Sequence, residues 1–371
     1  MNLIILKNNL KEGIKSLERI SVANSSLPIL KNFLIETQDN KIKLSATDLE
    51  LAVTSFVTGK IINTGELTIP LNIFSAIINN IQTERITLEI INNKLLIKTD
   101  NYQAEINGTK KEEFPIIPQI TNTQNHLEIK NFILRDALAS VINSTAAENK
   151  PELNGVLFDF QINSLKIVTT DSFRLSEKTI NNNQFNTNFN KPFKIIIPSK
   201  AVQEVIKELQ NNDEEKTTIF LDQNQILFKT EKTEIISRLI NGEFPEYTQI
   251  IPKNYETEVI INKEELINAV KLAGIFAERL SEVKIITKES NKSIEVFSFS
   301  QIIGENKYLI PAKINGATME AVFNWRFVLD GLKNIKSENI FLGLNSSNKP
   351  ALIRSNEDES WFYVLMPIKN Q

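Results

Sequence analysis

Apolar positions along the chain recur with two periods, and the two kinds of segment alternate in a fixed order. Residues 3–17 begin as a short apolar strand and continue with Leu10, Ile14 and Leu17 at i, i+4, i+7 spacing. That spacing places the three side chains on one face of an amphipathic helix. Residues 127–141 and 259–273 repeat the pattern, with the apolar triplets Leu134, Leu138, Val141 and Leu266, Val270, Ala273.

A second helix and a pair of strands follow in each copy. The second helices are expected in residues 67–81, 194–209 and 320–335, where apolar residues again recur at helical spacing. Pro70 and Pro198 lie near the starts of the first two, where the missing N–H of proline is harmless, and Asn324 takes that place in the third. Strand-like runs joined by turn residues then occupy 85–100, 216–231 and 339–355.

The repeat predicts three related domains in residues 1–122, 123–253 and 254–371. Each would hold two helices packed on antiparallel sheets, so the fold class is α+β. A length of 371 residues suits two or three domains of roughly 100–150 residues. Residues 121–126 and the stretch around 252–254 are the expected linkers. Because the third copy diverges most, a duplicated domain followed by an unrelated one is the alternative.

Composition excludes several classes of site. The chain has no cysteine and one histidine, His126, which excludes disulfides, cysteine-based metal sites and any multi-histidine metal site. His126 falls in an expected linker, and we expect it to be exposed. Neither of the two common glycine-rich nucleotide loops occurs. No apolar run reaches the ~18–20 residues that span a bilayer, and the N-terminus lacks the features of a secretory signal. We therefore expect a cytoplasmic protein without a membrane segment or cofactor.

The segment Thr170-Asp171-Ser172-Phe173-Arg174 is the best candidate for catalytic chemistry. Its carboxylate, hydroxyl groups and guanidinium would suit a hydrolase that uses Asp171 and Arg174. The alternative interpretation is that Asp171 caps a turn between two strands. We favour the turn, because residues 47–48 repeat the Thr-Asp pair in the first copy with leucine following.

The first helix also carries a basic stripe beside its apolar face. Lys11, Lys15 and Arg19 are spaced by four residues, so they lie on one side of that helix. The net charge of −3, from 42 basic and 45 acidic residues, excludes a uniformly basic nucleic-acid binder but not a local basic face. Helices from three copies could present such groups to one polyanion through sequence-independent phosphate contacts.

Several motifs, in their order along the chain, resemble those of the bacterial sliding clamp family, the beta subunit of DNA polymerase III. They are SLPIL (26–30) with SATDLE (45–50), LNGVLF (153–158), TDSFRL (170–175), GEFPEY (242–247) and YVLMPIK (363–369). The resemblance covers the whole chain. It implies three clamp domains per chain and a head-to-tail dimeric ring that encircles duplex DNA. Such a ring is a polymerase processivity factor and not an enzyme.

The resemblance implies the partners as well. They are double-stranded DNA bound without sequence preference, the replicative polymerase, the clamp loader, other proteins with clamp-binding peptides and a second copy of the chain. The peptide pocket between the second and third domains would be formed by Leu153, Thr170, Ser172, Phe173, Arg174, Leu175, Pro245, Gln249, Ile250, Pro350, Val364, Leu365, Met366, Pro367 and Ile368. Ser172-Phe173 replaces a more usual glycine-histidine pair and Gln249 a frequent arginine, so peptide preference is expected to differ.

Two further surfaces follow from the resemblance and from the basic stripe. Lys150 and Lys200 match basic positions of relatives, so the expected DNA contacts are Lys150, Lys200, Lys11, Lys15 and Arg19. The expected dimer interface joins Gly274, Ile275 and Phe276 of the third domain to Ala104 and Ile106 of the first. A repeat-built structural or adhesion protein without a DNA role is the competing hypothesis, and the basic helix stripe favours DNA.

Overall fold

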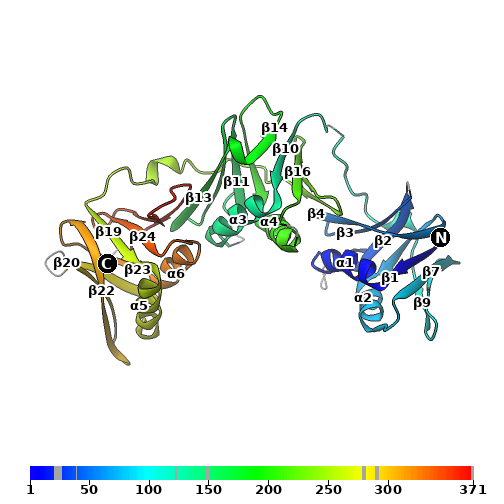
Figure 1. Cartoon of the computed structure of the whole chain (residues 1–371), viewed down its shortest axis with the longest axis horizontal. Coiled ribbons are helices and arrows are strands. Elements are labelled where there is room, and N and C mark those ends of the chain that lie inside the picture. The colour runs from blue at the N-terminus through cyan, green and yellow to red at the C-terminus, as the bar shows by residue number, and fades with distance from the viewer. Residues whose placement is uncertain are drawn as a thin grey trace. The chain divides into compact units, whose positions relative to one another are not determined.

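The structure is a computed structural model, and it describes residues 1–20, 27–38, 40–121, 123–147, 150–211, 213–277, 281–288 and 292–368 (Figure 1). The motif residues Ser26 and Lys369 lie outside the described residues. The described part holds six α-helices, two in each predicted repeat. They are α1 (Lys7–Glu18), α2 (Leu71–Asn80), α3 (Asn131–Val141), α4 (Ser199–Glu208), α5 (Lys263–Phe276) and α6 (Trp325–Lys333).

The chain forms two compact units. The first unit comprises residues 1–135, 184–190 and 200–239, and the second comprises 136–183, 191–199 and 240–371. The middle repeat is therefore divided between them. The division follows strand pairing, because one sheet joins the middle repeat to the first and another joins it to the third.

The first unit contains two antiparallel sheets. The five-stranded sheet has the order β5 (Gly59–Asn63), β1 (Asn2–Leu6), β7 (Arg85–Ile91), β8 (Lys94–Lys98) and β9 (Gln103–Asn107). The nine-stranded sheet has the order β14 (Phe185–Thr187), β10 (His126–Lys130), β16 (Lys216–Leu221), β17 (Gln225–Lys229), β18 (Thr233–Arg238), β4 (Leu51–Val57), β3 (Lys41–Thr47), β2 (Asn32–Gln38) and β6 (Glu66–Pro70).

The second unit is built on one twelve-stranded antiparallel sheet. Its order is β15 (Phe193–Pro198), β11 (Gly155–Gln161), β12 (Ser164–Thr170), β13 (Arg174–Asn181), β26 (Trp361–Leu365), β25 (Ala351–Ser355), β24 (Asn339–Leu344), β19 (Thr257–Asn262), β22 (Gly304–Gly316), β21 (Ser293–Ser300), β20 (Glu282–Lys288) and β23 (Glu320–Asn324). The long strand β22 pairs with β21 over its first part and with β19 over its second.

The apolar helix triplets are buried as their spacing predicts. Leu10, Ile14 and Leu17 of α1 are at most 2% exposed, and the triplets of α3 and α5 are equally buried. Gly13 allows α1 to lie directly on β4, because a Cβ at this position would come within 2.4 Å of Val57. Burial of these faces against the sheets is the main stabilising contribution in each repeat.

The connection between β7 and β8 shows that local residues can predict a turn. The β7–β8 hairpin turns at Asn92 and Asn93, which have φ values of 49° and 59°. Positive φ at both central positions is the geometry of a two-residue hairpin turn, which favours asparagine.

The prediction that His126 is exposed was wrong. His126 begins strand β10 and is half-buried, with its ring 6.0 Å from that of Phe220. The strand pairing of β10 with β16 extends the sheet into the expected linker.

Among the described helices, none is long and apolar enough to cross a membrane. Within the same ranges, no group of three or more acidic or histidine side chains is arranged to hold a metal ion.

Candidate functional site

The turn between β12 and β13 is held by hydrogen bonds from its own side chains. Asp171 Oδ1 accepts hydrogen bonds from the backbone N–H groups of Phe173 and Arg174, both at 2.9 Å. Thr170 Oγ1 accepts one from Ser172 N at 3.2 Å and donates one to Arg174 O at 2.7 Å. These bonds hold Ser172 at a φ of 76°. The interpretation of Asp171 as a turn cap is therefore confirmed, and its carboxylate is engaged in structure.

The same turn occurs in the first repeat, after β3. Asp48 Oδ1 accepts hydrogen bonds from Glu50 N at 3.0 Å and Leu51 N at 2.7 Å. Thr47 Oγ1 accepts one from Leu49 N at 3.0 Å, and Leu49 has a φ of 81°. A Thr-Asp pair thus encodes one turn geometry twice, because its two side chains satisfy the same backbone donors in both copies.

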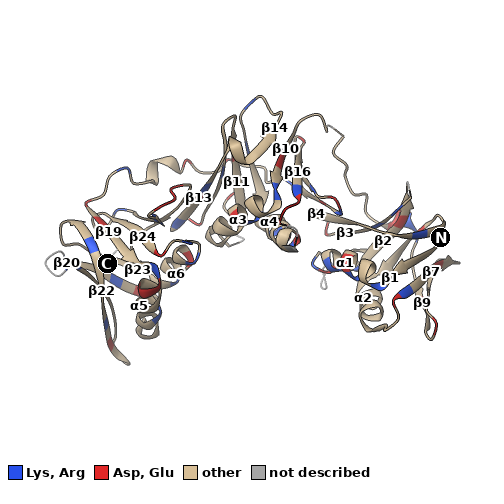
Figure 2. Ribbon diagram, in the orientation of Figure 1, with Lys and Arg blue, Asp and Glu red and all other residues tan. Residues whose placement is uncertain are grey.

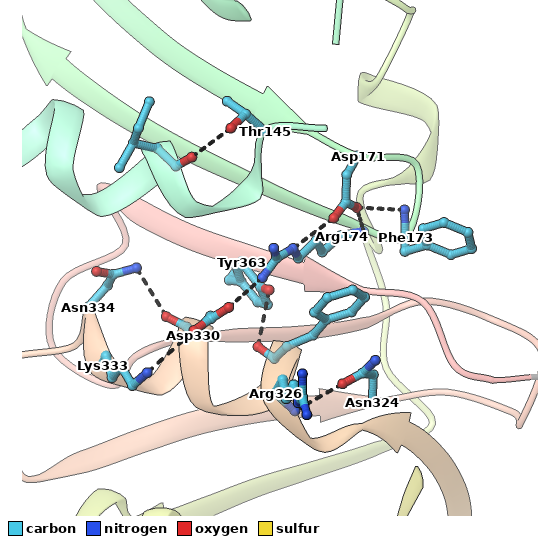
Figure 3. Close-up of polar contacts among 12 residues, drawn as sticks. Thr145, Asp171, Phe173, Arg174, Asn324, Arg326, Asp330, Lys333, Asn334 and Tyr363 are labelled. Carbon is cyan, nitrogen blue, oxygen red and sulfur yellow. Dashed lines mark hydrogen bonds and ion pairs between the residues drawn. The ribbon is translucent and has the colours of Figure 1, made fainter. Parts of the chain in front are cut away.

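Arg174 is fixed in place by three groups. Its Nε donates to Asp171 Oδ2 at 2.8 Å, and its Nη1 donates to Asp330 Oδ2 of α6 at 2.7 Å (Figure 3). The guanidinium also lies over the ring of Phe327, 4.1 Å from its centroid. The arginine side chain is only 11% exposed. The cation therefore joins the turn to α6 and has little capacity left for a ligand charge.

Two pKa values near the turn reflect this environment. Burial by itself lowers the pKa of Arg174, but its interactions with Tyr363, Asp330 and Asp171 outweigh that effect, so the pKa is raised. Burial raises the pKa of Tyr363, and the neighbouring Arg174 opposes that rise only in part. Arg174 therefore stays charged and Tyr363 stays neutral, which excludes both as a general base.

An apolar wall lies beside the turn where β13 pairs with β26. The paired residues are Arg174 with Leu365 and Leu175 with Val364. Leu175 and Val364 are both fully buried in one apolar cluster. Beyond the strand, Met366 N donates to the carbonyl of Phe173 at 2.9 Å. The predicted C-terminal pocket residues are thus held against the predicted turn residues.

Phe173 stands apart from its neighbours. Its backbone is held by Asp171 and by Met366, yet its side chain is 63% exposed. Figure 3 shows its ring pointing away from Arg174. A large apolar side chain on a fixed backbone is available to a partner at low conformational cost.

The remaining predicted pocket residues divide into two groups. Gln249, Ile250 and Pro350 line a shallow hollow of about 440 Å³, together with Tyr255, Glu256, Asn345 and Lys349. Leu153 and Pro367 are buried, whereas Pro245 is exposed and Ile368 is half-buried. The structure therefore brings the turn and the C-terminal strand together directly and places the 249–250 segment in the neighbouring hollow.

Sequence reasoning missed the residues that immobilise Arg174. Asp330, Phe327 and Tyr363 come from α6 and β26, and Asp330 lies 156 positions from Arg174 in the chain. One signal was available, because Asp330 occupies the same helix position as Glu204 in the second copy. An acid at this position in two copies indicates a role in contacts between repeats.

The predicted DNA contacts differ in how free their charges are. Lys11, Lys15 and Lys150 are exposed, and no carboxylate in the described residues pairs with them. Lys200 is paired with Asp48, and Arg19 is paired with Glu204 and Glu208. Figure 2 shows acidic segments among the basic ones on α1 and α4. The free positive charge on these helices is therefore small.

The predicted interface residues also differ in exposure. Ile275 is 62% exposed at the end of α5, and Leu272 beside it is 42% exposed. Gly274 packs under Trp325, since a Cβ there would lie 2.8 Å from the indole. In β9, Ala104 is half-buried and Ile106 is 5% exposed. The side chain of Ile106 is therefore buried against its own sheet.

Family comparison assigns the three repeats in order. Models of the N-terminal, central and C-terminal domains of the DNA polymerase III beta subunit match residues 1–118, 128–246 and 248–369. The divergent third copy therefore matches the same family as the first two. This removes the alternative of a duplicated domain followed by an unrelated one.

Individual relatives match over their full length. The beta sliding clamp of Bacillus subtilis (strain 168) is 26% identical over 382 residues, covering 100% of both chains. That of Chlamydia muridarum is 28% identical, covering 100% of this chain and 99% of the relative. A crystal structure of the DNA polymerase sliding clamp from Bacillus subtilis superimposes with a TM-score of 0.94 at 25% identity, again covering 100% of both chains.

Proposed function

The chain belongs to the DNA polymerase III beta subunit family, and from that premise we propose that it forms a dimeric ring around duplex DNA. The ring tethers the replicative polymerase and other peptide-bearing partners and is opened by a clamp loader. In this proposal the protein is cytoplasmic and catalyses no reaction. The domains extend over residues 1–122, 123–253 and 254–371.

A repeated rule of strand pairing carries the proposal of a ring. The strand β4 of the first repeat pairs with β18, the last strand of the second, and β13 of the second repeat pairs with β26, the last strand of the third. The third repeat offers β22 in the corresponding place. Applied once more, the rule pairs β22 with β9, the last strand of the first repeat, in a second copy.

Both strands have an edge available for this pairing. The strand β9 lies at the edge of the five-stranded sheet. Within the described residues, positions 304–311 of β22 pair with β21 on one side only. An unpaired strand edge is a template for pairing with another chain. Two copies joined head to tail through these edges close a ring with two identical seams.

The helices at such a seam carry no charge at the positions where the first internal junction is ionic. Aligning the helix triplets makes Ser16 and Arg19 of α1 equivalent to Leu272 and Ile275 of α5. By the same alignment, Glu204 and Glu208 of α4 correspond to Ala76 and Asn80 of α2. The two contacts that join α1 to α4 through ionic groups would therefore become contacts of Leu272 and Ile275 with the partner's α2. Ile73 of α2, 48% exposed, adds to that apolar surface.

The predicted interface of Gly274, Ile275 and Phe276 with Ala104 and Ile106 fits this seam. Ile275 supplies the exposed side chain, and Ala104 and Ile106 supply the backbone of β9. Burial of apolar surface on both sides gives the seam its free energy, with little contribution from charge. Its affinity should consequently persist at high salt.

Charged substitutions at the seam test the ring. Leu272→Asp with Ile275→Asp should convert the dimer to a monomer in sedimentation equilibrium, because two carboxylates would be buried without partners. Ile162→Asp is the matched control, since Ile162 is 57% exposed outside the proposed seam. A dimer that survives the double substitution would contradict the seam, and a monomeric wild-type chain would contradict the ring itself.

For DNA, we propose contact through Lys11, Lys15 and Lys150, and through Lys200 if a phosphate replaces its single partner Asp48. Arg19 is left out, because two carboxylates already neutralise it. Lysine contacts to phosphate are independent of sequence and weaken with salt. With so few free cations, retention on DNA would depend on topological linkage and only slightly on affinity.

For partner peptides, we propose a site at the β12–β13 turn, the C-terminal strand and the 249–250 segment. The exposed side chains of Phe173 and Ile250, with a few polar groups beside them, have the chemistry of a peptide groove. Arg174 is neutralised by Asp171 and Asp330, and Gln249 carries no charge, so this site would select apolar and aromatic anchors over acidic ones.

A further inference from the structure

We propose that Arg19 is a positioning residue that locks the first repeat to the middle one through Glu204 and Glu208. The residue stands in the basic stripe of α1 and was expected to contact DNA. Its contacts give it a different role, within one compact unit of the chain. The inference goes beyond the ring and holds for the single chain whether or not a ring forms.

Arg19 makes a hydrogen bond to each of two carboxylates on α4. Its Nε lies 2.7 Å from Glu204 Oε2, and its Nη2 lies 2.8 Å from Glu208 Oε2. Both acids lie on α4, one turn apart, so the planar guanidinium spans two successive turns of the facing helix. A lysine could not occupy both acceptors with the same geometry.

The carboxylate oxygens of Glu204 and Glu208 also accept hydrogen bonds from other side chains. Glu208 also accepts hydrogen bonds from Ser16 Oγ and Thr233 Oγ1, each at 2.7 Å. Glu204 accepts one from Lys207 at 2.8 Å. Ser16 belongs to the first repeat and Thr233 to the β18 strand of the middle repeat. The network therefore connects α1, α4 and β18 through four carboxylate oxygens.

Burial makes this network consequential. The Glu204 side chain is 5% exposed, and those of Glu208 and Arg19 are 17% and 19% exposed. Loss of Arg19 would leave Glu204 with Lys207 alone and Glu208 with two hydroxyl groups and no cation, which is destabilising for carboxylates that are this little exposed. Arg19 is thus required by the acids and is shielded from a phosphate.

The pairing of β4 with β18 joins the two repeats through their sheet, but a hollow lies beside the network on α1. It measures about 440 Å³ and is lined by residues of α1, β4 and the β17–β18 turn, with Arg19, Glu208 and Thr233 at its wall. Close-packed side chains would fix the helices by shape. Here the strand pairing of β4 with β18 holds the sheets together, and the hydrogen-bonded side chains fix α1 against α4.

The contact of Arg19 with Glu204 and Glu208 has no equivalent at the same positions of the other internal junction. The positions equivalent to Arg19 in α3 and α5 are Asn143 and Ile275. At the other internal junction, Ser140 and Asn334 take the places of Ser16 and Glu208, and they meet through one hydrogen bond of 3.0 Å from Asn334 Nδ2 to Ser140 O. Only the first junction has an arginine between two acids at these positions.

The absence of cysteine from the chain allows a direct test by paired spin labels. Glu84→Cys and Gln223→Cys place labels at exposed positions of the first and middle repeats, in the same compact unit. Double electron–electron resonance on full-length protein, diluted with unlabelled protein, then reads the distance within one chain. We expect a narrow distribution for the parent and a broad one for Arg19→Ala, with partial recovery for Arg19→Lys.

A triple substitution separates positioning from stability. Arg19→Met with Glu204→Gln and Glu208→Gln leaves no unpaired buried charge, so the unfolding midpoint should recover toward the parent. The distance distribution should stay broad, and amide exchange in α4 should remain at least about tenfold faster than in the parent. A narrow distribution in the triple variant or in Arg19→Ala would overturn the proposal.

Lys15→Ala is the matched control, because Lys15 lies one turn away on α1 and is exposed. It should leave the distance distribution unchanged. For DNA binding the two variants should behave in the opposite way. Lys15→Ala should reduce the slope of log affinity against log salt concentration by about one, while Arg19→Ala leaves it unchanged. A reduced slope for Arg19→Ala with an unchanged distribution would restore Arg19 as a DNA contact.

Discussion

The two internal junctions of the chain use one strand arrangement with different side chains. In each, a strand that follows a Thr-Asp turn pairs with the last strand of the next repeat, β4 with β18 and β13 with β26. At the first junction charged pairs flank the turn, since Asp48 pairs with Lys200 and Glu50 with Arg238, and Leu49 between them is 45% exposed. At the second, the turn carries the exposed ring of Phe173.

This difference separates a closed junction from one available to a partner. At the second junction the charged residue of the turn, Arg174, faces inward to Asp330, and Trp361 donates from Nε1 to Ser176 Oγ at 2.9 Å. These contacts stabilise the junction on the inner side of the turn. The outer side of the turn is left apolar, so a repeated turn can serve recognition in one copy and closure in the other.

The largest effect expected at these junctions comes from Arg174→Ala. It leaves Asp171 and Asp330 without their cation and removes the stacking on Phe327, so stability should fall by about 2–4 kcal/mol. Urea unfolding measures this. The control is Arg238→Ala at the first junction, whose side chain is 58% exposed and whose loss should cost less than about 1 kcal/mol. Equal losses for the two variants would contradict the distinction between the junctions.

Removal of the exposed ring should affect binding and not stability. Phe173→Ala should weaken a peptide with leucine and phenylalanine anchors by about 10–30-fold, the effect of losing one interface anchor. Fluorescence anisotropy with a labelled peptide measures the affinity. Leu49→Ala removes the exposed apolar side chain of the turn at the first junction, one position before the equivalent of Phe173, and should leave the affinity as it was. If Leu49→Ala weakened the peptide as much, recognition would not be confined to the second junction.

A smaller loss of stability is expected from Trp361→Phe. The indole donates to Ser176 Oγ and, at 3.2 Å, to Ser140 O, and phenylalanine keeps the apolar contact but not the donor. Two hydrogen-bond acceptors then lose a partner, which should cost about 1–2 kcal/mol. Thermal unfolding checks the value. No change in the unfolding midpoint would show that the indole contributes only through its apolar surface.

The smallest effect is expected from Lys336→Ala. Lys336 pairs with Asp136 at 2.7 Å across the second junction, but its side chain is 87% exposed. Solvent and salt screen such a pair, so its loss should change stability by about 0.5 kcal/mol or less. Chemical denaturation at low and high salt measures this. A loss as large as that for Arg174→Ala would mean that surface charge, and not the buried arginine, joins the repeats.

Much of the fold follows from local pattern, and much of the site does not. The burial of Leu10, Ile14 and Leu17 could be predicted, because apolar residues at helical spacing form the face of the helix that packs on the core. The Asp171 cap was also predictable, since its partners lie within three residues. Such local features repeat in all copies or in two of them.

The contacts between repeats could not be predicted in this way. Arg19 meets Glu204 from 185 positions away, and no periodicity links them. Its spacing from Lys11 and Lys15 correctly places it on one side of the helix, yet it does not tell whether a phosphate or a carboxylate will face it. His126 was misplaced for a related reason, because pairing with β16 depends on residues far along the chain.

The central claim is that the protein holds DNA by encircling it. Its most direct test is retention on circular and on linearised DNA after loading by a clamp loader, at a salt concentration that screens phosphate contacts. We predict that the protein stays on circles and is lost from linear DNA through the ends. Equal loss from both forms, under conditions in which a known clamp is retained on circles, would contradict topological linkage.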